Sequence, residues 1–117
     1  MESESLKMAK TFLGKTVKVE IDRPLGSKHP KHGFVYEANY GFVLNTKAPD
    51  GEDLDVYYLG IEKSIQKSEG VCIAIVHRKD DDDDNLVVVP EGIILSDEEI
   101  MRKVHFQEQW FDSEIVR

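Results

Sequence analysis

The chain contains 117 residues, of which 40% are hydrophobic and 32% are charged, and it carries a net charge of −8. This length predicts a single domain over residues 1–117 with one hydrophobic core. The negative charge argues against a protein that binds nucleic acid by neutralising its phosphates. It is compatible with the binding of divalent cations, whose sites are built from carboxylates, and also with a charge that only keeps the protein dissolved.

The N-terminal segment, MESESLKMAKTFLGK, begins acidic and contains no continuous apolar stretch. We therefore expect neither a signal peptide nor a membrane anchor, and no membrane partner. A short helix and an irregular arm both fit residues 5–13. The single cysteine, Cys72, excludes an intrachain disulfide and favours a reducing cytoplasm as the location. Its apolar neighbours predict a small core residue.

The first clear strand pattern is KTVKVEID, residues 15–22. Val17, Val19 and Ile21 fall on one side and polar residues on the other, which predicts a half-buried strand. The next segment, RPLGSKHPKHG at residues 23–33, contains two prolines and two glycines, which are incompatible with regular structure. This basic segment contains no acidic residue; its basic residues are Arg23, Lys28, His29, Lys31 and His32.

Further strands are predicted through the middle of the chain. Residues 34–45, rich in aromatic and β-branched side chains, predict one or two short strands, and residues 54–61 predict another. The apolar run VCIAIVH, residues 71–77, is typical of a central strand. Five aspartates at residues 80–84 then predict a turn, and LVVVP at residues 86–90 predicts the partner strand of a hairpin with an acidic tip.

The C-terminal part predicts a helix. Ser96 followed by Glu99 has the pattern of a capping box, which marks a helix start. The tail, residues 106–116, is predicted to continue this helix. Five or six short strands with closely spaced turns, followed by a helix, predict a mainly β (α+β) fold in the form of a small barrel.

Two clusters of acidic residues are the first feature of the sequence that indicates a possible functional site. Asp50, Glu52 and Asp55 lie within six positions, where carboxylates strongly raise one another's pKa unless a cation binds between them. Hard oxygen ligands select Mg²⁺, Mn²⁺ or Ca²⁺. The alternative is an ordinary acidic turn at the end of a strand. The aspartates at residues 80–84 likewise predict either a solvated hairpin tip or a second set of ligands, and two metal ions together stabilise the attacking and leaving oxygens in phosphoryl transfer.

The basic segment supplies complementary charge. Arg23 and Lys28 are candidate substrate-binding residues, because arginine and lysine bind phosphate oxygens. Tyr40, in the motif NYGF, offers either a hydroxyl that donates to a phosphate or an ordinary buried ring with its hydroxyl at the rim. Carboxylates, metal ions and a cationic loop together predict metal-assisted hydrolysis of a small, highly charged phosphate compound.

Three motifs, NYGFV at 39–43, DGEDLDV at 50–56 and LVVVP at 86–90, resemble those of the soluble family I inorganic pyrophosphatases in order and spacing. The resemblance covers roughly residues 16–92. It implies a closed five-stranded OB-like barrel with a C-terminal helix packed outside. It also implies hydrolysis of pyrophosphate to two phosphates with Mg²⁺, or alternatively Mn²⁺, in the cytoplasm, and it suggests a homo-oligomer.

The resemblance also implies roles for individual residues. Glu52 resembles the carboxylate that accepts a proton from the attacking water, and Tyr40 resembles the catalytic-site tyrosine that binds phosphate. Metal ligands are implied at Asp50, Glu52, Asp55, Asp80 and Asp83. Glu20 resembles a glutamate just outside the metal ligands, and Lys28 stands where the family has a phosphate-binding arginine.

The chain departs from the family pattern at several positions. Glu52 replaces an aspartate, Asn85 replaces the lysine before LVVVP, and the family's C-terminal Tyr-Lys pair has no counterpart in FQEQWFDSEIVR. These departures leave two alternatives open. One is a hydrolase of another small phosphate compound, such as a nucleotide. The other is a degenerate module that binds metal or phosphate without turnover.

Overall fold

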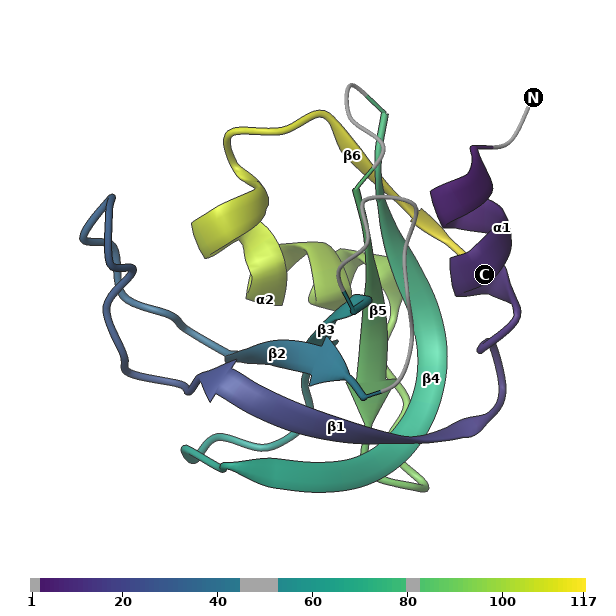
Figure 1. The fold of residues 1–117 in the computed structure, drawn as a ribbon, viewed down its shortest axis with the longest axis horizontal. Helices are drawn as coiled ribbons and strands as arrows, with labels where there is room; N and C mark the ends of the chain where they lie inside the picture. The colour runs from purple at the N-terminus through teal and green to yellow at the C-terminus, as the bar shows by residue number, and fades with distance from the viewer. Residues whose placement is uncertain (1–2, 45–52, 80–82) are drawn as a thin grey trace.

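The structure is a computed structural model that describes residues 3–44, 53–79 and 83–117. Five strands close into a barrel in the order β1-β2-β3-β5-β4, with β4 pairing back onto β1 (Figure 1). The strands are β1 (Thr16–Arg23), β2 (Asn39–Val43), β3 (Asp55–Tyr58), β4 (Lys67–Arg78) and β5 (Asp84–Val89). The predicted mainly β fold with a closed five-stranded barrel is therefore confirmed.

Strand β4 is the longest strand, and it closes the barrel by pairing with both β1 and β5. Its first residues pair with β1, and the rest pairs with β5 in the predicted antiparallel hairpin. A register shift between Cys72 and Ala74 marks a bulge, which bends the strand and increases its twist. This curvature carries β4 from the barrel wall to the end where Arg78 lies (Figure 1).

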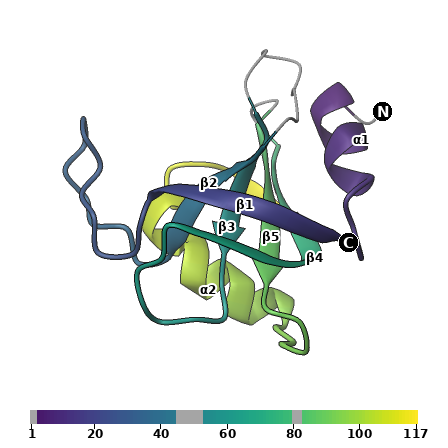
Figure 2. The same ribbon diagram turned by 60° about the horizontal axis from the view of Figure 1, so that its bottom comes forward.

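Two helices lie outside the barrel, on different sides of it (Figure 2). Helix α1 (Glu4–Lys10) packs against β4 and β5, so the N-terminal segment is a short helix rather than an irregular arm. Helix α2 (Asp97–Glu108) begins with the predicted capping box. The Ser96 side chain accepts from the Glu99 N–H, and the Glu99 carboxylate accepts from the Ser96 N–H.

The prediction that the tail continues this helix is wrong. Helix α2 ends at Glu108, and strand β6 (Ser113–Val116) then adds antiparallel to the end of β4. Asp112 and Ser113 are typical turn residues, and Ile115 and Val116 are β-branched, which favours a strand once an edge is available. The long β4 provides that edge.

The buried hydrophobic residues form two clusters. The interior cluster fills the barrel and includes Val19, Val56, Cys72, Ile75, Leu86 and Val88. The helix-side cluster lies between the barrel and α2 and includes Tyr57, Val76, Val87, Ile100, Val104 and Phe106. Successive residues of β3 alternate between the clusters, as the period of a strand requires. Cys72 is fully buried, as predicted, and burial raises the pKa of its thiol to about 11.

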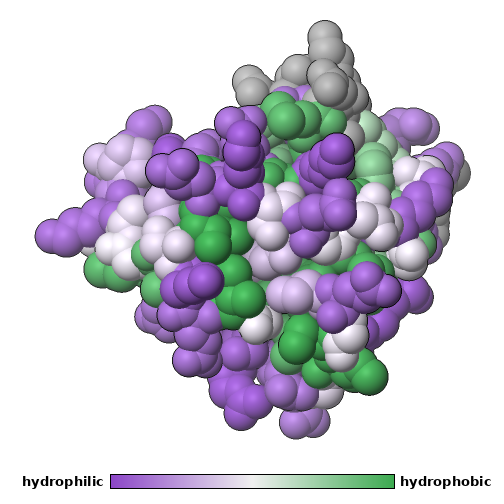
Figure 3. All heavy atoms as spheres, turned by 90° about the horizontal axis from the view of Figure 1, so that it is seen from below, coloured by the Kyte–Doolittle hydropathy of each residue, from purple (hydrophilic) through white to green (hydrophobic). Residues whose placement is uncertain are grey.

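The surface mixes polar and apolar residues. On the face seen in Figure 3, hydrophobic side chains lie in small patches separated by hydrophilic ones. Ile94 and Trp110 are the most exposed of the large hydrophobic residues described. Among the described residues, no helix has the length and apolar character needed to cross a membrane.

Candidate active site

Parallel pairing of β3 and β5 brings the residues beside the two acidic clusters together. Asp55, the first residue of β3, is the register partner of Asn85, the second residue of β5. Tyr40 of β2 also reaches this place, and its hydroxyl donates to Asn85 Oδ1 at 2.8 Å. The barrel closure therefore gathers residues that are far apart in sequence at one site.

A cavity of about 740 Å³, here called the site cavity, opens between this part of the barrel, the basic segment and the end of α2. Its size falls in the range of small-molecule sites. It is lined by Asp22, Arg23, His29, His32, Phe34, Tyr36, Tyr40, Asp55, Arg78, Gln107, Trp110 and Phe111. Cationic, acidic and aromatic side chains from separate elements thus converge on one space.

Behind the cavity wall lies a buried polar network centred on Glu108. Arg78 donates to both carboxylate oxygens of Glu108, with Nε–Oε1 at 3.0 Å and Nη2–Oε2 at 2.7 Å. Tyr57 and Ser113 also donate to this carboxylate, and Gln107 donates to the Tyr57 hydroxyl. Burial alone would raise the pKa of Glu108, but these hydrogen bonds and the Arg78 charge lower it below its ordinary value. The carboxylate therefore stays ionised.

Arg78 extends this network to the second acidic cluster. Its Nη1 donates to Asp83 Oδ2 at 2.9 Å, and the guanidinium carbon lies 3.9 Å from the centroid of the Phe111 ring. Burial disfavours its charge, but the hydrogen bonds and charge of Glu108 outweigh burial and raise the pKa of Arg78. Arg78 is thus a permanent, buried cation in the wall of the cavity.

Asp55 has the most perturbed carboxylate of the cavity. Burial is the main reason that its pKa rises from 3.8 to about 7, and the negative charge of Asp83 raises it further. The Tyr40 hydroxyl and the Arg78 charge act in the opposite direction. A divalent cation between Asp55 and Asp83 would remove this repulsion, so the oxygen donors fit a hard metal ion.

A complete metal site depends on more than these two residues. Across residues 3–44, 53–79 and 83–117, no three acidic, histidine or cysteine side chains cluster closely enough to bind a metal. Three of the predicted ligands, Asp50, Glu52 and Asp80, lie outside the described residues, and so does the predicted catalytic role of Glu52. Asn85 also has a polar atom whose hydrogen bond the described residues do not supply. It is fully buried, and its amide nitrogen has no hydrogen-bond partner within the described part of the chain.

The structure places the other predicted residues at different distances from this site. Arg23 lines the site cavity, as do Tyr40 and Asp55. Glu20 is exposed on β1, and Lys28 is exposed in the basic segment; neither lines the cavity. Of the aspartate run, Asp83 faces Arg78, whereas Asp84 begins β5 and is buried beside His77.

Sequence reasoning missed the aromatic wall and its cationic partner. Phe34, which directly follows the basic segment, packs against Trp110, with ring centroids 5.2 Å apart, and against His29 at 4.9 Å. Arg78 was also missed, although an arginine two residues before an aspartate run is a signal for an ion pair. Trp110 and Phe111 belong to the tail that was predicted to continue the helix, so their part in a cavity wall was not foreseen.

Comparisons with known proteins agree with the family that the sequence motifs predicted. A family model described as inorganic pyrophosphatase matches residues 10–112. Solved pyrophosphatases are similar in fold: that of Ehrlichia chaffeensis has a TM-score of 0.69 at 16% identity and covers 89% of this chain and 86% of its own. That of Coxiella burnetii has a TM-score of 0.61 at 21% identity, covering 86% and 83%.

The inorganic pyrophosphatase of Helicobacter pylori has a TM-score of 0.63 at 18% identity and covers 86% of this chain and 82% of its own. A search of the curated proteins finds no match. The reaction predicted from the sequence, hydrolysis of inorganic pyrophosphate, is that of the matched family. From its motifs, its barrel and the match over residues 10–112, the chain belongs to the inorganic pyrophosphatase family.

Proposed function

We propose that pyrophosphate is hydrolysed to two phosphates in the site cavity, with Mg²⁺, or alternatively Mn²⁺, as cofactor. Asp55 and Asp83 would hold metal ions together with Asp50, Glu52 and Asp80. The bound ions would lower the pKa of a water molecule and stabilise charge on the phosphoryl oxygens. Glu52 is the proposed acceptor of the water proton.

The chain's own residues account for substrate binding. Arg23 lines the cavity and is the proposed ligand of phosphate oxygens. The Asn85 amide nitrogen is a buried donor that an ordered water would satisfy, and it lies behind the cavity wall next to Tyr40. Tyr40 holds the Asn85 amide in place by donating to its oxygen. This bond makes Tyr40 a residue that positions Asn85 as well as a candidate phosphate ligand.

One observation carries the proposal: the Asp55 carboxylate is partly buried in the cavity wall, close enough to Asp83 for the two charges to repel. Two carboxylates that repel each other at or beside a cavity wall are costly without a metal ion between them. The arrangement supports a metal-dependent phosphate site more than a surface acidic turn.

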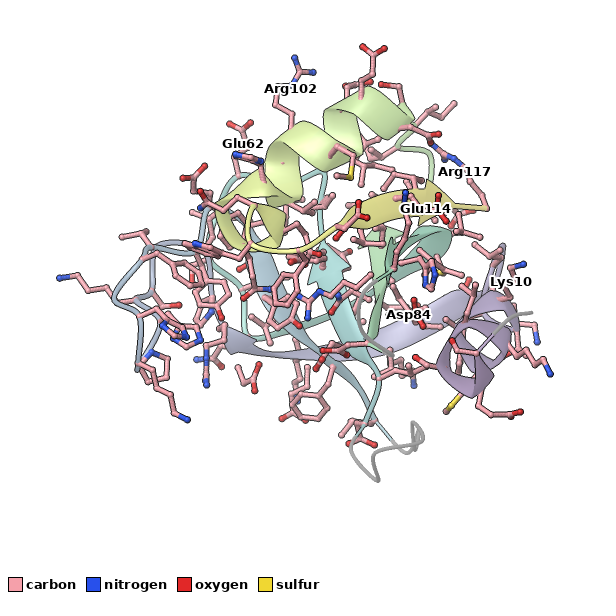
Figure 4. The ribbon with its side chains drawn as sticks, turned by 90° about the horizontal axis from the view of Figure 1, so that it is seen from above. Lys10, Glu62, Asp84, Arg102, Glu114 and Arg117 are labelled. Carbon is pink, nitrogen blue, oxygen red and sulfur yellow. The ribbon has the colours of Figure 1, made fainter. Side chains whose placement is uncertain are left out.

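The test is phosphate release from pyrophosphate by the purified protein, with Mg²⁺, with Mn²⁺ and with EDTA. We expect metal-dependent release and a loss of about a hundredfold or more in Asp55→Asn. Glu62→Gln is the matched control, since Glu62 is exposed and lies outside the site cavity (Figure 4). No release with either metal would contradict the proposal and favour a module that binds without turnover.

A second candidate function, hydrolysis of a nucleoside polyphosphate, is favoured by the aromatic wall. The cavity of about 740 Å³ has room for more than a pyrophosphate, and Trp110 is 60% exposed beside Phe34. Stacking of a planar base on such rings contributes about 1–3 kcal/mol. A base bound there would leave the phosphates toward Arg23 and the carboxylates.

Assays with a nucleotide and with pyrophosphate as separate substrates distinguish the two proposed functions. If the second holds, ADP or ATP is hydrolysed, and Trp110→Ala lowers kcat/KM for the nucleotide about tenfold while leaving pyrophosphate unchanged. Ile94→Ala, at an exposed hydrophobic residue outside the site cavity, is the control. Pyrophosphate turnover alone, unaffected by Trp110→Ala, would exclude the nucleotide.

The single domain over residues 1–117, the cytoplasmic location and the homo-oligomer stay proposals. Cell fractionation would test the location. Light scattering of the purified protein at several concentrations would test the assembly.

A further inference from the structure

We propose that Arg78 is a phosphate-binding residue whose bridge to Asp83 is exchanged on substrate binding, so that the phosphate takes the guanidinium and Asp83 turns to a metal ion. This inference rests on the proposed function of the site cavity. In this proposal, the guanidinium of Arg78 and a metal ion compete for the same carboxylate, that of Asp83.

Arg78 is positioned to meet a ligand. It is the last residue of β4, and the hairpin brings it beside Asp83, which precedes β5 by one position. It is only 6% exposed, yet it lines the site cavity together with Asp55 and Arg23. A buried cation at a cavity wall interacts with an entering anion more strongly than a surface lysine does, because water screens it less.

The guanidinium is held rigidly by contacts that do not use all its donors. Glu108 binds it through two parallel hydrogen bonds, and Phe111 packs on its face. Tyr57 and Ser113 in turn fix the carboxylate of Glu108. An arginine has five N–H donors, and the described residues engage them through three hydrogen bonds of 2.7–3.0 Å. The remaining N–H groups belong to the atoms Nη1 and Nη2.

The two partners of Arg78 differ in a way that allows exchange. The Glu108 side chain is 1% exposed, so separating it from Arg78 would leave an unpaired buried charge. The Asp83 side chain is 39% exposed, so solvent or a metal ion can replace Arg78 there at much lower cost. Glu108 therefore anchors the guanidinium, whereas Asp83 is the exchangeable partner that a phosphate oxygen would replace.

If the exchange takes place, the variant Arg78→Met should bind inorganic phosphate more weakly and Mg²⁺ more tightly than wild type. Binding of inorganic phosphate, measured by calorimetry in EDTA, should weaken about tenfold to a hundredfold, as for loss of a charged hydrogen bond. Binding of Mg²⁺ without phosphate should become tighter, because Asp83 is released. Damage to the fold would weaken both. Arg78→Lys keeps the charge without the planar fork and should bind phosphate with intermediate affinity.

Arg102→Met is the matched control. Arg102 is exposed and projects from α2 away from the barrel (Figure 4), so its loss should change neither affinity. Equal phosphate binding by wild type and Arg78→Met in EDTA would overturn the proposal. So would wild-type protein that binds no phosphate without metal. Pyrophosphate hydrolysis with Mg²⁺ is scored separately, so failure of this inference is distinguishable from failure of the proposed function.

Two further measurements keep the test decisive if Arg78→Met does not fold. In wild-type protein, the NMR resonance of the Arg78 Nε–H should shift on titration with inorganic phosphate in EDTA. In Asp83→Asn, which alters a half-exposed side chain, phosphate should bind more tightly because its competitor for Arg78 is gone. An unmoved resonance, or weaker phosphate binding in Asp83→Asn, would overturn the exchange.

Discussion

The interior cluster and the helix-side cluster are formed by alternate residues of the same strands, but they differ in composition. In β3, Val56 and Tyr58 point into the barrel, while Tyr57 between them points to α2. The interior cluster is mainly aliphatic. The helix-side cluster is rich in aromatic rings and continues into the buried pair of Arg78 and Glu108. The interior cluster thus stabilises the barrel, and the buried polar network lies on the outer side of the barrel, where a helix covers polar side chains.

Breaking the buried ion pair should have the largest effect on stability. In Glu108→Ala, we expect a loss of about 3–5 kcal/mol in the free energy of unfolding, because Arg78 remains buried without its main partner. Urea denaturation measures it. Glu98→Ala, at an exposed position of the same helix, should change stability by less than about 0.5 kcal/mol. Equal stability of the two variants would contradict the role of the network.

A cavity created by mutation in the interior cluster should lower the stability of the barrel without lowering the activity of the site cavity. Ile75 is fully buried there, so Ile75→Ala should cost about 2–5 kcal/mol of unfolding free energy. Pyrophosphate hydrolysis by the folded fraction should stay close to that of wild type, because no side chain of the site cavity is touched. A large fall in kcat well below the unfolding temperature would show that the two clusters are not independent.

The pH dependence of the metal-free protein should reveal the strain at Asp55. Because its folded pKa is raised from 3.8 to about 7, the native state holds a proton that the unfolded chain releases. Stability in EDTA should therefore fall as pH rises from about 4 to 7, by up to a few kcal/mol. Groups that act on Asp55 are Asp83, Tyr40, Arg78 and Asp22.

Asp55→Asn removes this dependence, so the variant should be more stable than wild type at neutral pH in EDTA. Mg²⁺ should restore wild-type stability and leave the variant nearly unchanged. Urea midpoints at two pH values, with and without Mg²⁺, provide the comparison. A wild-type midpoint that does not decrease between these pH values would show that Asp55 is not strained.

The smallest effect is expected at the start of α2, away from the cavity. Ser96→Ala removes the side chain that accepts from the Glu99 N–H and should cost about 1 kcal/mol. Activity should be unchanged, because only the other end of α2 lines the site cavity. Thermal unfolding and steady-state kinetics measured together would reveal any coupling between the two ends.

Much of the barrel could be predicted from local patterns. The alternation around Val17 to Ile21, the apolar run containing Cys72, and the capping box at Ser96 each follow from physical preferences of a few neighbouring residues. Their order, with closely spaced turns, favoured a barrel. The family motifs then correctly predicted that the barrel is closed and has five strands.

The site was harder, because it is made by contacts between distant parts of the chain. Arg78 and Glu108 are 30 positions apart, and neither belongs to a motif. Strand β6 was missed because the aromatic residues at the end of α2 fit a helix face, while the free edge of β4 exists only after folding. The meeting of Asp55 with Asn85 likewise depends on the parallel pairing of β3 and β5, which no local signal predicts.

Locating the metal ions and the phosphate in a crystal would test the proposed site and the role of Arg78 together. A crystal grown with Mn²⁺ and phosphate would reveal the metal by anomalous scattering and the phosphate by its density. We expect Mn²⁺ bound to Asp55 and Asp83, and a phosphate in contact with Arg78 in the site cavity. Metal bound away from both carboxylates, with Arg78 still paired to Asp83, would contradict it.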